Sequence, residues 1–485
     1  MTIQEKYLKI ADEVIAKGPY KPDWASFDDY EVPKWFTNAK FGIFIHWGLF
    51  SIPAFRNEWY SRNMYIQSMD EWQHHRDTYG EHTKFGYKDF IPMFTAPNFD
   101  PAEWVRLFKK AGARYVMPVA EHHDGFQMYD SEISEYNSKN MAMHRDVLGE
   151  LKEEILKNDM IFCESNHRVE HAFFFSHGKN FDSDVKDPMK LGDYYYPSIP
   201  EAGDMDMFSP APPADFLEDW LARNVELVEK YRPSMVYFDW WIQHESVKPY
   251  LMKFIAYYYN RAEEWGMKVG ISYKHDAMML GTGILDMERG HFSDAKPFPW
   301  QADTSMAFNS WCYTAQNEFK NVTHILQDLV DIVSKNGCLL LNVGPKSDGT
   351  ICDEEIKLLE EIGAWMDVNG EAIYDTHPWR VQAEGNTEVV EGMFSEQGRK
   401  DFDSSDIRFT CKRNFIYIIP MQQHGEDVIV KNMGEKSKDF HGIIEDFSVL
   451  GYDEKPEFTR DDDKMTIHAP FVDSDTPVVY KMTLR

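Results

Sequence analysis

Short apolar runs alternate with amphipathic segments along most of the chain, and this alternation constrains the fold more than any other feature of the sequence. Each run is too short for a buried helix, and apolar residues recur at helical spacing in the segments between the runs. We expect strands at 41–45, 115–120, 160–164, 235–238, 268–273, 285–288 and 339–343, with another near Met306. We expect helices at 3–16, 101–111, 146–158, 214–231, 247–265, 321–335 and 353–368. So many alternations predict a (β/α)₈-like (TIM-type) barrel.

The pattern changes after Pro378 and Trp379. Short alternating runs at 407–411, 415–419, 465–468 and 478–482 are separated by charged turns, with no helical period between them. This texture is typical of a small antiparallel β-sandwich. The sequence therefore predicts two domains: a catalytic barrel over residues 1–379, with a lead-in helix at its N-terminus, and a C-terminal sandwich over residues 380–485.

Composition excludes several classes of partner. The 485 residues are 43% hydrophobic, which is ample for a large core, and 51 basic against 81 acidic residues give a net charge of −30. A field of that sign repels phosphate backbones and anionic lipids, so we expect no nucleic-acid and no membrane partner. No basic segment followed by an apolar stretch opens the chain, and no apolar run could span a bilayer, so we expect a cytoplasmic protein. The five cysteines are scattered and form no Cys-x-x-Cys pair, which favours reduced thiols.

Polar residues gather where the predicted strands end, and in a parallel barrel those ends share one face. The strand ends supply His46, His122, His123, His167, Asp239 and Glu288, and nearby loops supply Glu58, Trp59, Trp240, Trp241 and Trp300. Imidazoles and carboxylates bind hydroxyls directionally, while indoles pack against the C–H face of a sugar. This combination favours a carbohydrate site.

A metal-dependent hydrolase is an alternative reading of the same residues, because three histidines and a carboxylate also suit zinc or iron. However, His122 and His123 are adjacent, so their side chains would point to opposite sides of a strand. The sequence also contains no His-Glu-x-x-His pair. We therefore expect no metal and no other cofactor.

Several of these residues lie in longer motifs, which are KFGIFIHWG (40–48), EWY (58–60), HHDGF (122–126), NGCLLLNVGP (336–345), DG (348–349), NGEAIY (369–374) and PW (378–379). In this order along the chain, the motifs resemble those of the α-L-fucosidases of glycoside hydrolase family 29. The resemblance implies a retaining exo-glycosidase that releases α-L-fucose from fucosylated oligosaccharides or glycoconjugates without a metal. It places the nucleophile on Asp239 and the sugar-binding residues on His46, Glu58, Trp59, His122 and His123.

The chain also departs from the family pattern. Tyr237 stands where the family often has tryptophan, and Lys274 stands where it often has arginine; we expect both to bind substrate. A retaining mechanism needs a second carboxyl group as general acid/base, and we assign that role to Glu288. Asp286, which we expect to point to the other side of the strand, Asp303 and Glu58 are the alternatives for this role. A non-catalytic fucose-binding barrel stays open as a second function, and neither the fucosyl linkage, the aglycone nor the oligomeric state follows from the sequence.

Overall fold

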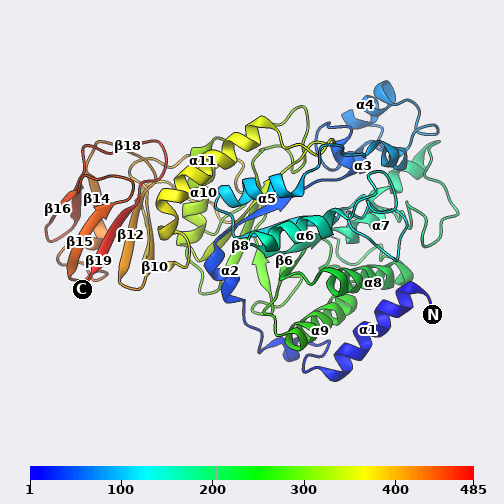
Figure 1. The fold of residues 1–485 in the computed structure, drawn as a ribbon, viewed down its shortest axis with the longest axis horizontal. Coiled ribbons are helices and arrows are strands. Elements are labelled where there is room, and N and C mark those ends of the chain that lie inside the picture. The colour runs from blue at the N-terminus through cyan, green and yellow to red at the C-terminus, as the bar shows by residue number, and fades with distance from the viewer. Residues whose placement is uncertain (204–205) are drawn as a thin grey trace.

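The computed structural model describes residues 1–203 and 206–485 and shows a barrel joined to a smaller set of antiparallel sheets (Figure 1). The barrel contains the N-terminus, and the sheets at the opposite end of the molecule contain the C-terminus. Within the described residues, no helix is both long and apolar enough to cross a membrane. The five cysteines are all free thiols.

Parallel strands form the barrel and close it through pairing of β1 with β2. Around the barrel they run in the order β1-β9-β8-β7-β6-β5-β4-β2. The short strand β3 precedes β4 in the chain, and both strands pair with β2. The strands are β1 (Phe41–Ile45), β2 (Tyr115–Glu121), β3 (Ile161–Phe162), β4 (Glu164–Asn166), β5 (Met235–Phe238), β6 (Gly270–Lys274), β7 (Ile284–Asp286), β8 (Trp300–Ser305) and β9 (Gly337–Val343). The predicted barrel is confirmed.

Helices cover the outside of the barrel (Figure 1). They include α1 (Ile3–Lys17), α2 (Lys34–Ala39), α5 (Pro101–Lys110), α6 (Val147–Lys157), α8 (Ala214–Tyr231), α9 (Lys248–Trp265), α10 (Val322–Ser334) and α11 (Asp353–Asn369). The Asp100 side chain caps α5 by accepting from the backbone N–H groups of Ala102 and Glu103. Arg232 ends α8 in the left-handed region, and Pro233 then directs the chain into β5. The lead-in helix α1 packs on α8 and α9.

Three strands differ from the sequence prediction. The strand expected at 285–288 is β7, which ends at Asp286, so Glu288 lies beyond it. The strand expected at 160–164 is broken into β3 and β4 at Cys163 and continues to Asn166. The strand expected near Met306 is β8, which ends at Ser305 and contains Asp303. Long connections follow three of the strands at their C-terminal ends; those after β1 and β4 carry the short helices α3 (Tyr60–Asn63), α4 (Asp70–Thr78) and α7 (His171–Phe174). These connections build the walls above the barrel.

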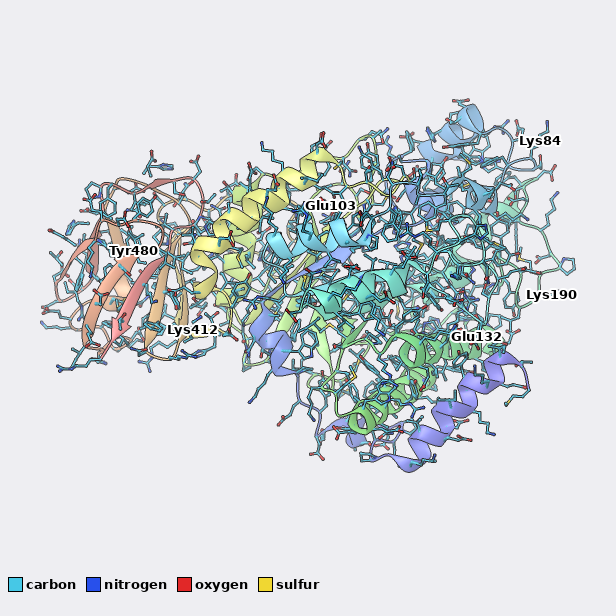
Figure 2. The ribbon with its side chains drawn as sticks, viewed as in Figure 1. Lys84, Glu103, Glu132, Lys190, Lys412 and Tyr480 are labelled. Carbon is cyan, nitrogen blue, oxygen red and sulfur yellow. The ribbon has the colours of Figure 1, made fainter. Side chains whose placement is uncertain are left out.

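The C-terminal part consists of antiparallel sheets that enclose their own apolar core. A five-stranded sheet has the order β10-β11-β12-β19-β15, a three-stranded sheet has the order β14-β17-β16, and β13 pairs with β18. Tyr480 (Figure 2) is buried in the core between the two larger sheets. The strands are β10 (His377–Glu384), β11 (Ile407–Lys412), β12 (Phe415–Pro420), β13 (Gln423–His424), β14 (Val428–Val430), β15 (Ile444–Val449), β16 (Glu457–Arg460), β17 (Met465–His468), β18 (Asp473–Ser474) and β19 (Tyr480–Leu484).

These sheets pack against α10 and the end of α11. Lys412 (Figure 2), at the end of β11, donates to the backbone oxygen of Tyr374 at 3.1 Å. The domain boundary expected between residues 379 and 380 falls inside β10, which pairs with β11.

Candidate active site

A cavity of about 470 Å³ opens at the C-terminal ends of the barrel strands, a size that suits a small ligand. Eleven of the residues singled out from the sequence line it: His46, Glu58, Trp59, His122, His123, His167, Tyr237, Asp239, Trp240, Glu288 and Asp303. Further lining comes from Asn57, Arg62, Asn63, Met69, Glu170, Trp311 and Phe394. The barrel thus brings together side chains separated by more than two hundred positions in the sequence.

Asp239 follows β5 directly and presents its carboxylate to the cavity. His167 Nδ1 donates to Asp239 Oδ2 at 2.8 Å, and His123 Nε2 lies 3.4 Å from the same oxygen. Burial would raise the pKa of Asp239, but His167, His123 and Lys274 together hold it well below its ordinary value. Asp239 is therefore an ionised carboxylate fixed at the end of a strand.

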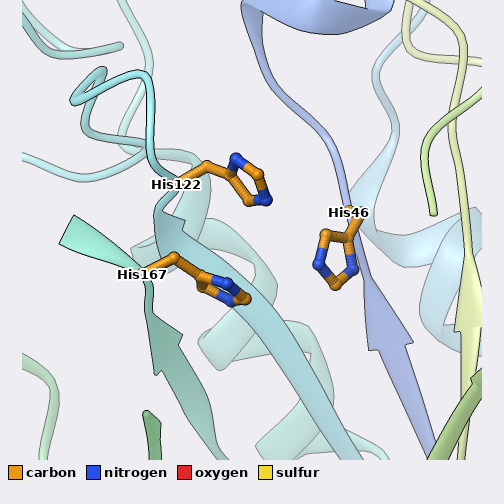
Figure 3. A group of neighbouring side chains, drawn as sticks. All are labelled: His46, His122 and His167. Atoms are coloured by element: carbon orange, nitrogen blue, oxygen red, sulfur yellow. The ribbon is translucent and has the colours of Figure 1, made fainter. Parts of the chain in front are cut away.

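Three imidazoles converge on the floor of the cavity from the ends of β1, β2 and β4 (Figure 3). The ring centroids of His46, His122 and His167 lie 4.9 to 5.5 Å apart. His46 Nδ1 donates to Asn342 Oδ1 at 2.7 Å, which leaves its Nε2 free to accept. Burial, followed by the neighbouring histidines, lowers the pKa of His46 and His122 well below the ordinary value. Both rings are neutral near pH 7 and can form hydrogen bonds with the hydroxyl groups of a ligand.

His123 links the histidines to a second carboxyl group. Its Nδ1 donates to the backbone oxygen of His167 at 2.9 Å, and its Nε2 lies 3.5 Å from Glu170 Oε2. Burial lowers the pKa of His123 to about 4. Burial and the charges of Asp239 and Glu288 raise the pKa of Glu170 well above its ordinary value. Glu170, in the cavity wall, therefore keeps its proton to higher pH than an ordinary glutamate does.

Glu288 follows β7 and faces the same cavity as Asp239. The indole N–H of Trp240 donates to Glu288 Oε2 at 2.7 Å, and Lys274 Nζ lies 3.1 Å from that oxygen. Burial raises the pKa of Glu288; Lys274 opposes this shift, and the charges of Asp303 and Asp239 add to it. A neighbouring pair of carboxyl groups with opposite pKa shifts can divide nucleophilic and acid roles.

Lys274 does not line the cavity but lies behind its wall, at the end of β6. Its ammonium group is fully buried and is held by Asp286 at 2.8 Å and by Asp303 at 3.1 Å, as well as by Glu288. These carboxylates raise the pKa of Lys274 well above its ordinary value, although burial opposes them. The positive charge of Lys274 is therefore balanced by carboxylates of the protein itself.

Besides Lys274, which we expected to bind substrate and which lies outside the lining, two other residues differ from the sequence prediction. Asp286 was expected to point away from Glu288, but both carboxylates bind Lys274, because side chains two residues apart on an extended chain share a face. Trp300, expected in a loop of the site, is fully buried at the start of β8, the opposite end of the strand. Tyr237 lines the cavity, and its hydroxyl donates to Asp303 Oδ2 at 2.8 Å.

Glu58 and Trp59 form the side wall that follows β1. Glu58 is buried and accepts from the backbone N–H of Trp311 at 3.0 Å; burial raises its pKa. The Trp59 ring packs against both His123 and Phe174, with ring centroids 5.7 and 5.2 Å away. Trp241 packs against Phe173, with 4.8 Å between the ring centroids, and is not part of the lining.

Seven residues of the cavity lining, Glu170, Trp311 and Phe394 among them, were not singled out from the sequence. Glu170 carries a signal that could have found it, because it follows the strand-end histidine His167 within one short helical turn. Trp311 comes from the loop-rich region after β8, where no periodicity marks it. Phe394 comes from the segment between β10 and β11, which the sequence places in the other domain.

Two groups in the described residues have ligand atoms close enough to hold a metal ion: His46, His122 and His167, and His123, His167 and Asp239, each within 4.8 Å. Both groups need His167. Its two ring nitrogens are already bound to Asp239 at 2.8 Å and to Ser165 at 3.0 Å. A metal would have to replace at least one of these hydrogen bonds.

Comparison with known proteins decides between the alternatives. The family model for α-L-fucosidase matches residues 8–371. The chain belongs to the α-L-fucosidase family. It is therefore a glycoside hydrolase that releases α-L-fucose, and the reading as a non-catalytic sugar-binding barrel is wrong.

Individual relatives agree with this assignment. The chain is 31% identical to the tissue α-L-fucosidase of Rattus norvegicus over 400 residues, which cover 78% of this chain and 77% of that protein. It is 32% identical to the tissue α-L-fucosidase of Homo sapiens over 403 residues, covering 79% and 78%. The α-fucosidase of Thermotoga maritima, solved alone and in complex with fucose, is 28% identical; the match covers 96% of this chain and 100% of that one, with a TM-score of 0.75.

Proposed function

We propose that this family member removes terminal α-L-fucose from fucosylated oligosaccharides or glycoconjugates with retention of configuration, using Asp239 as nucleophile and Glu288 as general acid/base. One observation carries the proposal: an ionised carboxylate and a carboxyl group of raised pKa face the same cavity from the ends of β5 and β7. A double displacement needs these two protonation states together.

In the first step, the Asp239 carboxylate attacks the anomeric carbon and forms a glycosyl ester. The bond between that carbon and the leaving oxygen breaks, and Glu288 gives its proton to the oxygen. In the second step, Glu288 takes a proton from water while the water oxygen attacks the anomeric carbon. The ester bond then breaks, which restores both carboxyl groups and releases fucose in its original configuration.

The surrounding residues support this chemistry. The neutral rings of His46 and His122, together with His123, Glu58 and Trp59, offer donors, acceptors and an apolar face to one sugar ring. The Thermotoga maritima relative has been solved with fucose and with a mechanism-based inhibitor, which supports the same ligand class for this cavity. Lys274 supports the site through Glu288, Asp286 and Asp303, so we assign it a positioning role instead of a sugar contact.

The configuration of the first product tests the proposal. Proton NMR during hydrolysis of an aryl α-L-fucoside should show α-L-fucose before mutarotation produces the β anomer. β-L-Fucose as the first product would contradict the double displacement. The same assay after dialysis against EDTA tests the metal alternative: we expect an unchanged rate, and a loss that zinc or iron restores would require a metal at the histidine cluster.

A further inference from the structure

A segment of the C-terminal half reaches into the active site. This arm, residues 390–399, lies between β10 and β11, and its residue Phe394 lines the cavity beside Trp240 and Glu288. Phe394 is 49% exposed, which is unusual for a phenylalanine next to buried catalytic carboxyl groups. Such a ring in a cavity wall presents an apolar surface to whatever enters.

The arm is bound to the stretch of backbone that carries Glu288. The Phe394 N–H donates to the Glu288 backbone oxygen at 2.8 Å, and the Gly392 N–H donates to that of His291 at 3.0 Å. Between these two contacts, a Cβ on Gly290 would lie 2.0 Å from the Gly392 oxygen. Only glycine permits this approach, so the arm and the acid/base segment form one unit.

Buried charges hold the arm from its other side. Glu396 pairs with Lys320 and accepts from the Thr304 hydroxyl, and all three side chains are buried. Further along the arm, Arg399 lies 3.2 Å from Asp328, and both are buried. Phe394 itself has φ of 58°, a left-handed conformation that a phenylalanine keeps only where its surroundings impose it. The backbone that carries the ring is therefore held in place from both sides.

The Phe394 ring lies nearly parallel to Trp240, with 6.2 Å between the ring centroids and 14° between the planes. Trp240 in turn donates to Glu288. The two rings are too close to hold a sugar between them, so they present adjacent apolar faces next to the acid/base. The leaving oxygen must lie beside Glu288 to receive its proton, and the aglycone begins at that oxygen.

We infer that Phe394 and Trp240 form the platform for the aglycone, and that it suits a pyranose ring with an apolar C–H face. This inference rests on the proposed function, because it takes Glu288 to be the acid/base. The arm thereby gives the C-terminal half a part in substrate selection. Phe394 is the specificity residue supplied by that half.

The test compares substrates with and without an aglycone ring. For Phe394→Ala, kcat/KM on α-L-fucosyl fluoride should equal that of the wild type, because fluoride offers nothing to stack. On the best substrate from a panel of α1,2-, α1,3-, α1,4- and α1,6-linked fucosyl disaccharides, kcat/KM should fall roughly threefold to tenfold. Phe394→Trp should restore it. Val390→Ala, on the same arm and 64% exposed but outside the cavity lining, is the matched control and should change neither substrate.

Two results would overturn the inference. An equal loss on fluoride and disaccharide would show that Phe394 supports the site structurally instead of contacting the aglycone. Unchanged disaccharide hydrolysis would show that the platform lies elsewhere. Failure of the proposed function would look different, because Glu288→Ala would then lower kcat/KM equally on fucosyl fluoride and on the disaccharide, whatever the result for Phe394→Ala.

Discussion

At the scale of single residues, Glu288 is a buried carboxyl group that receives one indole N–H and lies beside an ammonium group. An activated phenol leaves with little protonation, whereas a sugar alcohol needs it. Glu288→Ala should therefore lower kcat/KM on a fucosyl disaccharide by about 10²- to 10⁴-fold, but on a dinitrophenyl fucoside far less. Steady-state kinetics on both substrates measure the difference. An equal loss on both would move the role to Asp286, Asp303 or Glu58.

The pH dependence follows from the same groups. Activity requires protonated Glu288, whose pKa burial raises, so kcat/KM should fall as pH rises through that value. Asp239 stays ionised to very low pH because His167 offsets its burial, but His123, with a pKa of about 4, gains a proton first. The acid limb should therefore lie near pH 4. Fucosyl fluoride needs no general acid in the first step, so kcat/KM for this substrate should not fall on the alkaline side. An alkaline limb in that profile would contradict the assignment of Glu288.

Residue identity at the site was predictable wherever a strand end marked it. Asp239, His46 and His122 each follow an apolar run, so the barrel geometry alone brings them to one face. Lys274 also lies at a strand end, as predicted. Its three carboxylate partners are distant in the sequence, however, so the sequence does not show which carboxylates form ion pairs with it.

At the scale of elements, β8 shows why a search for apolar runs does not find every strand. Its residues Gln301 and Asp303 face the polar cluster around Lys274, and Thr304, on the other side of the strand, donates to Glu396. The strand therefore lacks the apolar run that revealed β1 and β5. The place of the arm in the active site was not predictable for another reason, because it depends on backbone contacts with residues about one hundred positions earlier.

The close contact between the arm and the acid/base segment gives a prediction for that element. Gly290→Ala should push Gly392 away and destabilise the fold by roughly 1–3 kcal/mol, with a lower Tm and weaker hydrolysis of fucosyl disaccharides. Gly203→Ala, where a Cβ meets nothing within 4 Å, is the control. Wild-type Tm and activity for Gly290→Ala would show that the arm does not pack there.

At the scale of the whole molecule, buried charges join the barrel to the C-terminal sheets. Asp331 on α10 accepts from Arg408 of β11 at 2.6 Å and from Lys335 at 2.8 Å, and His291 Nδ1 lies 3.0 Å away. The sequence predicts both parts, since alternating strands and helices give way to short strands. It does not predict this junction, because the partners lie far apart and each looks like an ordinary surface charge.

Loss of the Asp331 charge should therefore destabilise the entire protein. Asp331→Asn leaves buried cations without a counter-charge, and we expect a loss of about 3–5 kcal/mol in the free energy of unfolding, measured by denaturant titration. Asp462→Asn removes a partner of Lys436 at the surface and should change stability little. If both variants were equally stable, the junction would contribute nothing to the fold.

The central claim, that Asp239 is the nucleophile, is tested most directly by Asp239→Gly with azide. Hydrolysis of an activated aryl α-L-fucoside should fall by roughly four orders of magnitude, and azide should restore turnover by forming β-L-fucosyl azide. Asp276→Gly is the matched control: Asp276 also follows a barrel strand but is exposed and outside the cavity lining, so it should keep wild-type activity. A folded Asp239→Gly variant that retains near wild-type hydrolysis, or that azide never rescues, would contradict the account.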